Sequence, residues 1–326
     1  MSFDLNRSED QRQILDAAGA LLATGFPVAR LREGRSDDLA PLAEFGAFSL
    51  SVPEPEGGAG FTLVEEALLH ALLGRHLVSP RALAATLAAA VARRAGMADL
   101  AAAFAGLERQ ACLAVASGGD ILLLDPANAE MALLFEDRGL ALVEIAHAQP
   151  EAGLGRSLAV ARMPGDARIV ARSDDARVLA TADLLVSAQL LGVAEATRDL
   201  AVAYAGLRQQ FGKPIGAFQA IKHHCANMAI AAEMLSAQLD IAAIALADGR
   251  PDAEFQVAAL RRLAPRTALA NARACVQIHG GIGFSAEADA HHFVKQAHLL
   301  SRLGEARPIL DLPAPMAPLR PAHERT

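Results

Sequence analysis

Residues 208–223 read RQQFGKPIGAFQAIKH and separate two long apolar stretches of the chain. The turn over residues 212–216 cannot continue a helix, because it contains proline and two glycines. The preceding residues 183–207 have apolar side chains on most faces and predict a largely buried helix. The following residues 218–247 predict a second long helix. This part of the chain therefore predicts two neighbouring helices joined by a tight turn.

Further helices are expected on both sides of this pair. A third helix over 253–279 is stopped by the glycines of residues 280–283, and a fourth covers 286–303, so the C-terminal part predicts a four-helix bundle. The N-terminal part predicts helices that begin at caps such as Ser8 and Thr62, with a break at the turn rich in proline and glycine. These helices are expected over residues 9–23, 39–45, 62–73 and 82–107, the last one broken near Gly96, and the turn covers 50–60.

The middle of the chain has a different pattern. Short apolar runs of up to seven residues, separated by glycine and proline, predict a small antiparallel β unit over about residues 110–180. The runs are residues 111–116, 121–124, 131–135, 140–145, 158–163 and 177–179. The order of elements is therefore helices, a small β unit and a helical bundle.

Composition excludes several classes of protein. The chain of 326 residues is 53% hydrophobic but only 4% aromatic, with no Trp, which favours packed helices over a β-sandwich. A net charge of −7 disfavours a nucleic-acid partner. The residues near the N-terminus are polar, so no signal peptide is predicted. The longest uncharged stretch considered, residues 82–92, is too short to span a bilayer, so no membrane span is predicted either. Three widely spaced cysteines predict buried thiols and a cytoplasmic location.

Three blocks of sequence resemble the acyl-CoA dehydrogenase family. The first is the stretch 208–223, and the second reads QIHGGIGF over residues 277–284. A weaker third block reads LSVP over 50–53 and GGAG over 57–60. The resemblance implies a mainly α fold with a small β-barrel. Its parts are an N-terminal helical domain (residues 1–109), a reduced middle β domain (110–181), a C-terminal four-helix bundle (182–307) and an extended tail (308–326).

The resemblance also implies an activity. Family members desaturate an acyl-CoA thioester between its α and β carbons: a carboxylate removes the α-proton while the β-hydride passes to FAD. We therefore expect an FAD-dependent oxidoreductase that takes an acyl-CoA substrate and passes electrons to an electron-transfer flavoprotein.

The same resemblance assigns six cofactor-binding residues. An arginine guanidinium can fork onto two oxygens of a pyrophosphate, and in the family this arginine reaches an FAD bound mainly by a neighbouring subunit. A phenylalanine ring offers an apolar face, amides can meet adenine or ribose edges, and glycines let the backbone approach a ligand. Without the resemblance, the arginine and the glutamines would be read as ordinary surface residues, the phenylalanine as a core residue and the glycines as the end of a helix. They are Arg208, Phe211, Gln219, Gln277, Gly280 and Gly281.

The chain departs from the family at the flavin ring. The common homotetrameric members carry a T-E-P-x-A-G-S-D segment and a W-I-T-N segment that hold the ring and its phosphate. Here residues 113–121 read LAVASGGDI, in which Ser117 and the two glycines after it are at best a remnant, and the chain has no Trp. We therefore expect this chain to hold the isoalloxazine end poorly.

The chain departs from the family at the catalytic base as well. The usual position of the glutamate falls on Gly304, and Glu305 follows it. A second family position falls on Ala182, beside Asp183. One residue rotates a helical side chain by about 100°, so neither Glu305 nor Asp183 is a simple replacement, and both remain candidates.

The residues kept would serve a neighbour's FAD, whereas the residues lost would hold the chain's own flavin. This pattern, together with the run from Gly280 to His291, is similar to a subset of the family that forms α2β2 heterotetramers, many of which act on steroid side-chain thioesters. We expect the shorter subunit of such a pair. A self-sufficient homo-oligomer, a non-catalytic scaffold subunit, and a flavin monooxygenase or acyl-CoA oxidase on the same fold remain alternatives.

Two other patterns predict no site. The histidine pairs 223–224 and 291–292 lack the convergent partners of a metal site, so no metal is expected. Glu65 and Glu66 are adjacent, so their side chains point about 100° apart on a helix, and we expect them to be solvated helix charges.

Overall fold

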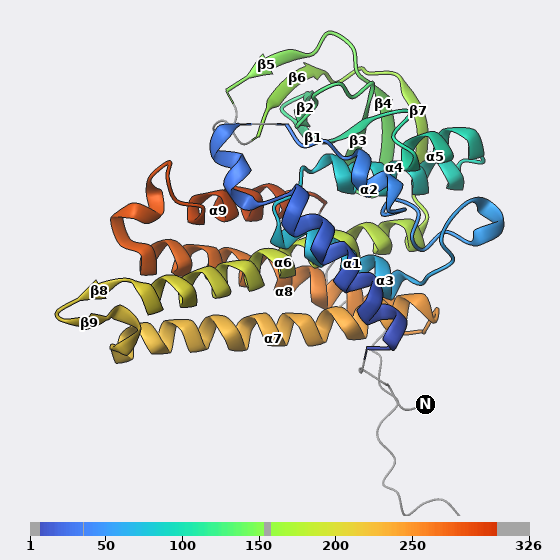
Figure 1. Ribbon diagram of the computed structural model, residues 1–326. Helices are drawn as coiled ribbons and strands as arrows, with labels where there is room; N and C mark the ends of the chain where they lie inside the picture. Colours follow the sequence, from blue (N-terminus) through green and yellow to red (C-terminus); the bar gives the residue numbers. More distant parts are fainter. Residues whose placement is uncertain (1–6, 35, 153–157, 305–326) are drawn as a thin grey trace, which may run out of the picture.

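The computed structural model describes residues 7–34, 36–152 and 158–304. The N-terminal helices lie between a β sheet on one side and the long C-terminal helices on the other (Figure 1). The helices predicted for the N-terminal part are confirmed, including the caps at Ser8 and Thr62, and each of these residues forms a capping box. The elements are α1 (Glu9–Gly25), η1 (Val28–Glu33), α2 (Ala40–Glu44), η2 (Glu54–Glu56), α3 (Leu63–Arg75), α4 (Arg81–Arg94) and α5 (Ala98–Ala105).

The middle segment forms one seven-stranded sheet in the order β5-β6-β2-β1-β3-β4-β7. Its pairs are antiparallel except β1 and β3, which run parallel, so the all-antiparallel prediction is wrong for that pair. No ladder joins β5 to β7 within the described residues. The strands are β1 (Ala111–Ser117), β2 (Asp120–Leu124), β3 (Met131–Glu136), β4 (Gly139–Glu144), β5 (Gln149–Glu151), β6 (Val160–Pro164) and β7 (Ile169–Ser173).

The prediction of a last strand over residues 177–179 is wrong. These residues are the first turn of α6, because the Asp175 carboxylate caps the helix by accepting hydrogen bonds from the N–H groups of Arg177 (3.0 Å) and Val178 (3.1 Å). The final strand is instead β7, which the apolar pattern did not reveal. The boundary expected at residue 182 therefore falls inside a helix.

Four helices form the C-terminal bundle, as predicted. α6 packs against α3, α7 and α8, and α9 packs against α6 and α8. Asn271 joins three of them, because its buried amide donates to the carbonyls of Ala194 on α6 and Met228 on α7, each at 3.1 Å. The bundle consists of α6 (Ala176–Leu207), α7 (Gln219–Ala247), α8 (Ala253–His279) and α9 (Ala290–Leu300).

The N-terminal part and the bundle meet where two helices cross at glycines. A Cβ on Gly192 of α6 would lie 1.9 Å from the Ala71 carbonyl oxygen, and one on Gly74 of α3 would lie 2.1 Å from the Gln189 carbonyl oxygen. Only glycine permits this approach, so α3 and α6 pack backbone to backbone.

Glu65 and Glu66 are buried, with 8% and 3% of their surface exposed, so the expectation of solvated charges is wrong. They begin α3, which packs against α1, α6 and α7. Glu65 accepts hydrogen bonds from the Thr62 backbone N–H (2.8 Å) and from the Gln11 amide (2.7 Å). Glu66 accepts a hydrogen bond from the Ser51 hydroxyl (2.6 Å), and burial raises its pKa to about 7.

The three cysteines are free thiols, as expected. Cys112 and Cys275 are buried, whereas Cys225 is partly exposed. Burial raises the pKa of the Cys112 and Cys275 thiols to about 12, so both are protonated at neutral pH.

Three described stretches are long and apolar enough to cross a membrane by length and composition: Glu9–Glu33, Ala176–Leu207 and Gln219–Ala247. The sequence interpretation considered only residues 82–92 and overlooked them. In α6, 72% of the most apolar window is buried inside the protein, so packing within the fold accounts for its hydropathy. The same share is 39% in α7, whose outer face is partly exposed.

Candidate functional site

The turn between α6 and α7 forms a small hairpin that projects from one end of the bundle (Figure 1). Its strands are β8 (Gln209–Gln210) and β9 (Lys213–Pro214), joined by Phe211 and Gly212. Both tip residues have positive φ, 53° and 78°, as a two-residue turn of type I′ requires. Such turns favour asparagine or aspartate before glycine, so a phenylalanine in this conformation is strained.

Phe211 is also 91% exposed. The edge of its ring meets the Phe218 ring with centroids 6.1 Å apart, and the Lys213 ammonium lies 4.5 Å from the Phe218 centroid. The Ile215 N–H donates to the Arg208 carbonyl at 2.8 Å and closes the base of the hairpin. The fold therefore holds an aromatic ring in solvent at a backbone cost, and strain of this kind is typical of functional sites.

A cleft of about 660 Å³ lies between this hairpin and the end of α8. It brings together five of the six predicted cofactor-binding residues: Arg208, Phe211, Gln277, Gly280 and Gly281. The sixth, Gln219, is the first residue of α7 and is exposed, but it does not line the cleft, although its neighbour Phe218 does.

The side chains of Arg208 and Gln277 have no polar partner among the residues that the structure describes. Both residues are exposed, and Arg208 makes no ion pair with any residue that the structure describes. Arg208 follows the last residue of α6, where the negative end of the helix dipole favours a cation. Its guanidinium is thus free to bind an anion from another molecule.

The glycines at the end of α8 (η4, Gly280–Phe284) leave one side of the cleft open. Gly280 has a φ of 65° and ends the helix. A Cβ on Gly281 would meet nothing within 4 Å, so the packing of this chain gives no reason for a glycine there. The open backbone at Gly281 fits the approach of a ligand.

Two cleft residues were not singled out from the sequence. The rings of Tyr204 on α6 and His279 on α8 stack with centroids 4.1 Å apart. The His279 Nδ1 lies 2.8 Å from the Cys275 carbonyl oxygen and donates to it, which leaves Nε2 as an acceptor. The one signal in the sequence is that His279 lies inside the second family block.

Only one of the two candidate catalytic bases lies in the part of the chain that the structure describes. Glu305 lies outside the described residues. Asp183 lies beside the usual base position, because a Cβ on Gly304 would be 3.8 Å from its Oδ1 and 3.6 Å from the Phe135 ring. Asp183 also pairs with the buried Arg261 (3.4 Å).

Arg261 gives Asp183 a structural role as well. The guanidinium donates to the Leu303 carbonyl, so it ties α6 and α8 to the chain that follows α9. The possible remnant of the family's flavin segment, Ser117 with the two glycines after it, lies at the β1–β2 turn, where Ser117 pairs with Asp120.

The cleft and Asp183 stand at opposite ends of α6. Arg208 follows Asp183 by 25 residues, which at 1.5 Å per residue is about 37 Å. A dinucleotide seated on Arg208 does not reach Asp183 of the same chain. The predicted cofactor-binding residues of the cleft and this candidate base are therefore far apart within one copy of the chain.

Comparison with known proteins identifies the family. The model of the acyl-CoA dehydrogenase C-terminal domain matches residues 176–304, from α6 to the end of the described chain. Acyl-CoA dehydrogenase IpdE2 of Mycobacterium tuberculosis is 34% identical over 81% of this chain and 80% of that protein. Acyl-CoA dehydrogenase FadE34 of the same organism is 35% identical over 82% of this chain, but the chain spans only 40% of FadE34.

A solved structure shows the same fold. The ChsE4-ChsE5 complex from Mycobacterium tuberculosis matches with a TM-score of 0.73 and 23% identity, over 91% of this chain and 94% of that chain. The family match of the bundle, the identity to IpdE2 over four-fifths of its length and this fold agree. The chain belongs to the acyl-CoA dehydrogenase family, whose members are FAD-dependent oxidoreductases.

Proposed function

We propose that this chain completes the FAD site of a partner dehydrogenase subunit, in an assembly that dehydrogenates an acyl-CoA thioester between its α and β carbons. The observation that carries the proposal is the cleft at the hairpin end of the bundle. It gathers an arginine without an ion-pair partner in the described chain, an exposed amide and an open glycine backbone around about 660 Å³.

The residues of the cleft fit the adenosine and pyrophosphate end of FAD. Arg208 offers a planar fork of donors that matches two phosphate oxygens, and Gln277 offers an amide donor and acceptor. Phe211 supplies an apolar face for a ring, and Gly281 lets backbone N–H groups approach the ligand. When bound, FAD supplies the hydride acceptor of the reaction.

The surroundings of the cleft support a second protein chain. Phe211 and Ile282, which line the cleft, are 91% and 48% exposed, and two residues close to cleft residues in sequence, Leu207 and Phe284, are 81% and 78% exposed. Clustered large apolar side chains of this kind are typical of protein interfaces. A partner covering them would enclose the cleft and supply the flavin ring's pocket.

The partner is proposed to be a second acyl-CoA dehydrogenase subunit in an α2β2 assembly. Support comes from the similarity to one chain of a complex of two named proteins, ChsE4 and ChsE5. The separation of about 37 Å between Arg208 and Asp183 along α6 supports a second chain in the site, whether that chain is a different subunit or another copy. The substrate is proposed to be a bulky thioester of the steroid side-chain type, with electron-transfer flavoprotein as the electron acceptor and the cytoplasm as the location.

A self-sufficient homo-oligomer is the second candidate. It is favoured by one observation, the position of the Asp183 carboxylate beside Gly304. In that arrangement Asp183 of one copy would act on a cofactor seated on Arg208 of another. The ion pair between Asp183 and Arg261 favours the heteromer instead, because it gives the carboxylate a structural role that does not require it to be the catalytic base.

The test compares the chain expressed alone with the chain co-expressed with a neighbouring dehydrogenase gene. We expect FAD, measured by visible absorbance after purification, and dehydrogenase activity only in the co-expressed assembly. Within that assembly Arg208→Ala should lower FAD content, whereas Arg138→Ala, at the exposed β3–β4 turn, should leave it unchanged. Yellow, active protein from the chain alone would overturn the heteromer, and full FAD content in Arg208→Ala would leave this chain a scaffold.

A further inference from the structure

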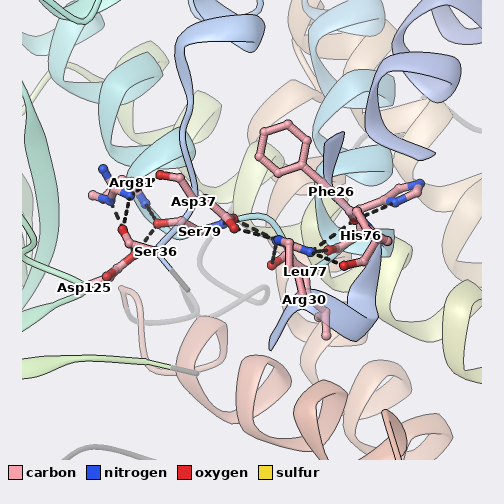
Figure 2. Close-up of polar contacts among 10 residues, drawn as sticks. Phe26, Arg30, Ser36, Asp37, His76, Leu77, Ser79, Arg81 and Asp125 are labelled. Carbon is pink, nitrogen blue, oxygen red and sulfur yellow. Dashed lines mark hydrogen bonds and ion pairs between the residues drawn. The ribbon is translucent and has the colours of Figure 1, made fainter. Parts of the chain in front are cut away.

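A second, smaller cavity lies away from the cleft, where the N-terminal part, the sheet and α9 meet. Its volume is about 110 Å³, too small for a flavin ring system. Two carboxylates, Asp37 and Asp125, line it together with Ser79 (Figure 2). Three residues of α9 line the opposite wall: His292, Lys295 and Gln296.

Asp37 is already neutralised by its own chain. Arg30 binds it with two parallel hydrogen bonds of 2.6 and 2.8 Å, and the Ser79 backbone N–H donates to it at 2.7 Å (Figure 2). The paired side chains are 11% and 4% exposed. A bidentate pair of this kind satisfies both oxygens of the carboxylate.

Asp125 is neutralised in the same way. It accepts a hydrogen bond from the Ser79 hydroxyl and pairs with the Arg81 Nε at 3.4 Å (Figure 2). Arg81 is held in turn by Ser36 and by the Asp37 carbonyl, at 2.9 and 2.6 Å. Neither carboxylate therefore leaves uncompensated negative charge in the cavity.

The residues of α9 that line the cavity, in contrast, offer hydrogen-bond donors and a positive charge. His292, Lys295 and Gln296 are spaced i, i+3 and i+4, so they share one face of the helix. His292 is 6% exposed, and neither of its ring nitrogens has a hydrogen-bond partner among the described residues. The buried Nε2 of Gln296 lacks one too, and the Lys295 ammonium makes no ion pair there.

Such donors are costly to leave unpaired. A buried polar group without a hydrogen bond costs about 1–3 kcal/mol, and here two occur on one face beside a cation. Burial, together with the positive charge of Lys295 and the proximity of His291, lowers the pKa of His292 to about 4, so at neutral pH its ring is neutral with one N–H donor. Arg32 adds positive charge near the cavity, although it is paired with Asp289.

We propose that this cavity binds a small oxyanion, a carboxylate or phosphate group, held by Lys295, His292 and Gln296. The anion supplies acceptor atoms to the unpartnered donors and negative charge to the lysine. A volume of about 110 Å³ has room for a group of that size, since a water molecule occupies about 30 Å³ of liquid. The proposal is independent of the function proposed for the cleft, because the two sites share no residue.

The lysines of the chain make the test selective. The sequence has only three, Lys213, Lys222 and Lys295, so reductive dimethylation with ¹³C gives three lysine side-chain signals by NMR. Single lysine-to-arginine variants assign them. The whole chain is titrated with phosphate in one series and acetate in another, at constant ionic strength set with chloride. Saturation by phosphate alone identifies a phosphate site, and saturation by acetate identifies a carboxylate site.

We expect the Lys295 signal to shift with saturation in at least one series, while the exposed Lys222 signal does not. Gln296→Leu should weaken that binding at least tenfold without lowering the melting temperature of the anion-free protein, because it removes a buried donor that has no partner there. A Lys295 signal that follows Lys222 in both series would overturn the proposal and leave a cavity filled by water. Equal affinity in Gln296→Leu would overturn it as well, because the proposed donors would then make no contact.

Discussion

The hairpin cleft and the α9 cavity region use their arginines in opposite ways. Near the cavity, Arg81 is buried and the Arg30 side chain is only 11% exposed, and each pairs with a carboxylate of the same chain. Arg208, in the cleft, is exposed beside an exposed aromatic ring and pairs with no described residue. A buried charge needs a compensating partner, which Arg30 and Arg81 find in their own chain, whereas an exposed charge such as Arg208 can be compensated by another molecule. The difference separates two arginines that pair within this fold from one that we propose binds a ligand.

The largest expected effect tests the buried side of this comparison. Arg81→Leu removes the guanidinium that joins Ser36, Asp37 and Asp125, and it leaves Asp125 buried with less compensation. Breaking a buried pair in this way costs about 3–5 kcal/mol of unfolding free energy. Urea unfolding measures it. The matched control is Arg94→Leu, whose pair with Asp175 is 63% exposed on the arginine side and should cost under about 1 kcal/mol.

The next effect concerns Glu66, a buried carboxyl that has a hydrogen bond but no ion-pair partner among the described residues. Burial raises the pKa of Glu66 from 4.5 to about 7, so the folded protein holds a proton that the unfolded chain has lost between those values. Stability therefore falls as pH rises from about 4.5 to 7, by about 3 kcal/mol, and levels off above pH 7. Glu66→Gln should remove this slope in unfolding measured across the range. An unchanged slope in the variant would show that another group titrates.

The sequence predicted the C-terminal helices closely, because glycine and proline stops set their ends. It also predicted five residues that the fold gathers at the cleft, since they lie in two short blocks at the ends of neighbouring helices. It did not predict contacts set by tertiary packing: the burial of Glu65 and Glu66, and the approach of Asp183 to Gly304. The helical start of α6 was missed because a single cap, Asp175, outweighs the β-like run after it.

A smaller effect tests the strained side of the comparison. Phe211→Asn places a residue that favours positive φ at the hairpin tip, so it should raise the unfolding free energy by about 1 kcal/mol. The same change removes the exposed ring and should lower FAD content in the co-expressed assembly. Stability gained together with cofactor lost would show that the strain serves binding. Cofactor retained at wild-type level would mean that Phe211 is not a ligand contact.

The smallest effect distinguishes two glutamines that the sequence treats alike. Gln277 lines the cleft, and Gln219 does not. Gln277→Leu should weaken FAD binding by about 0.5–1 kcal/mol, roughly twofold to fivefold, because one hydrogen bond to the ligand is lost. Gln219→Leu should leave affinity unchanged when FAD is titrated into the apo assembly and followed by flavin fluorescence. An equal loss in both variants would mean that the ligand extends past the cleft to the start of α7, and the boundary drawn between the two glutamines would be wrong.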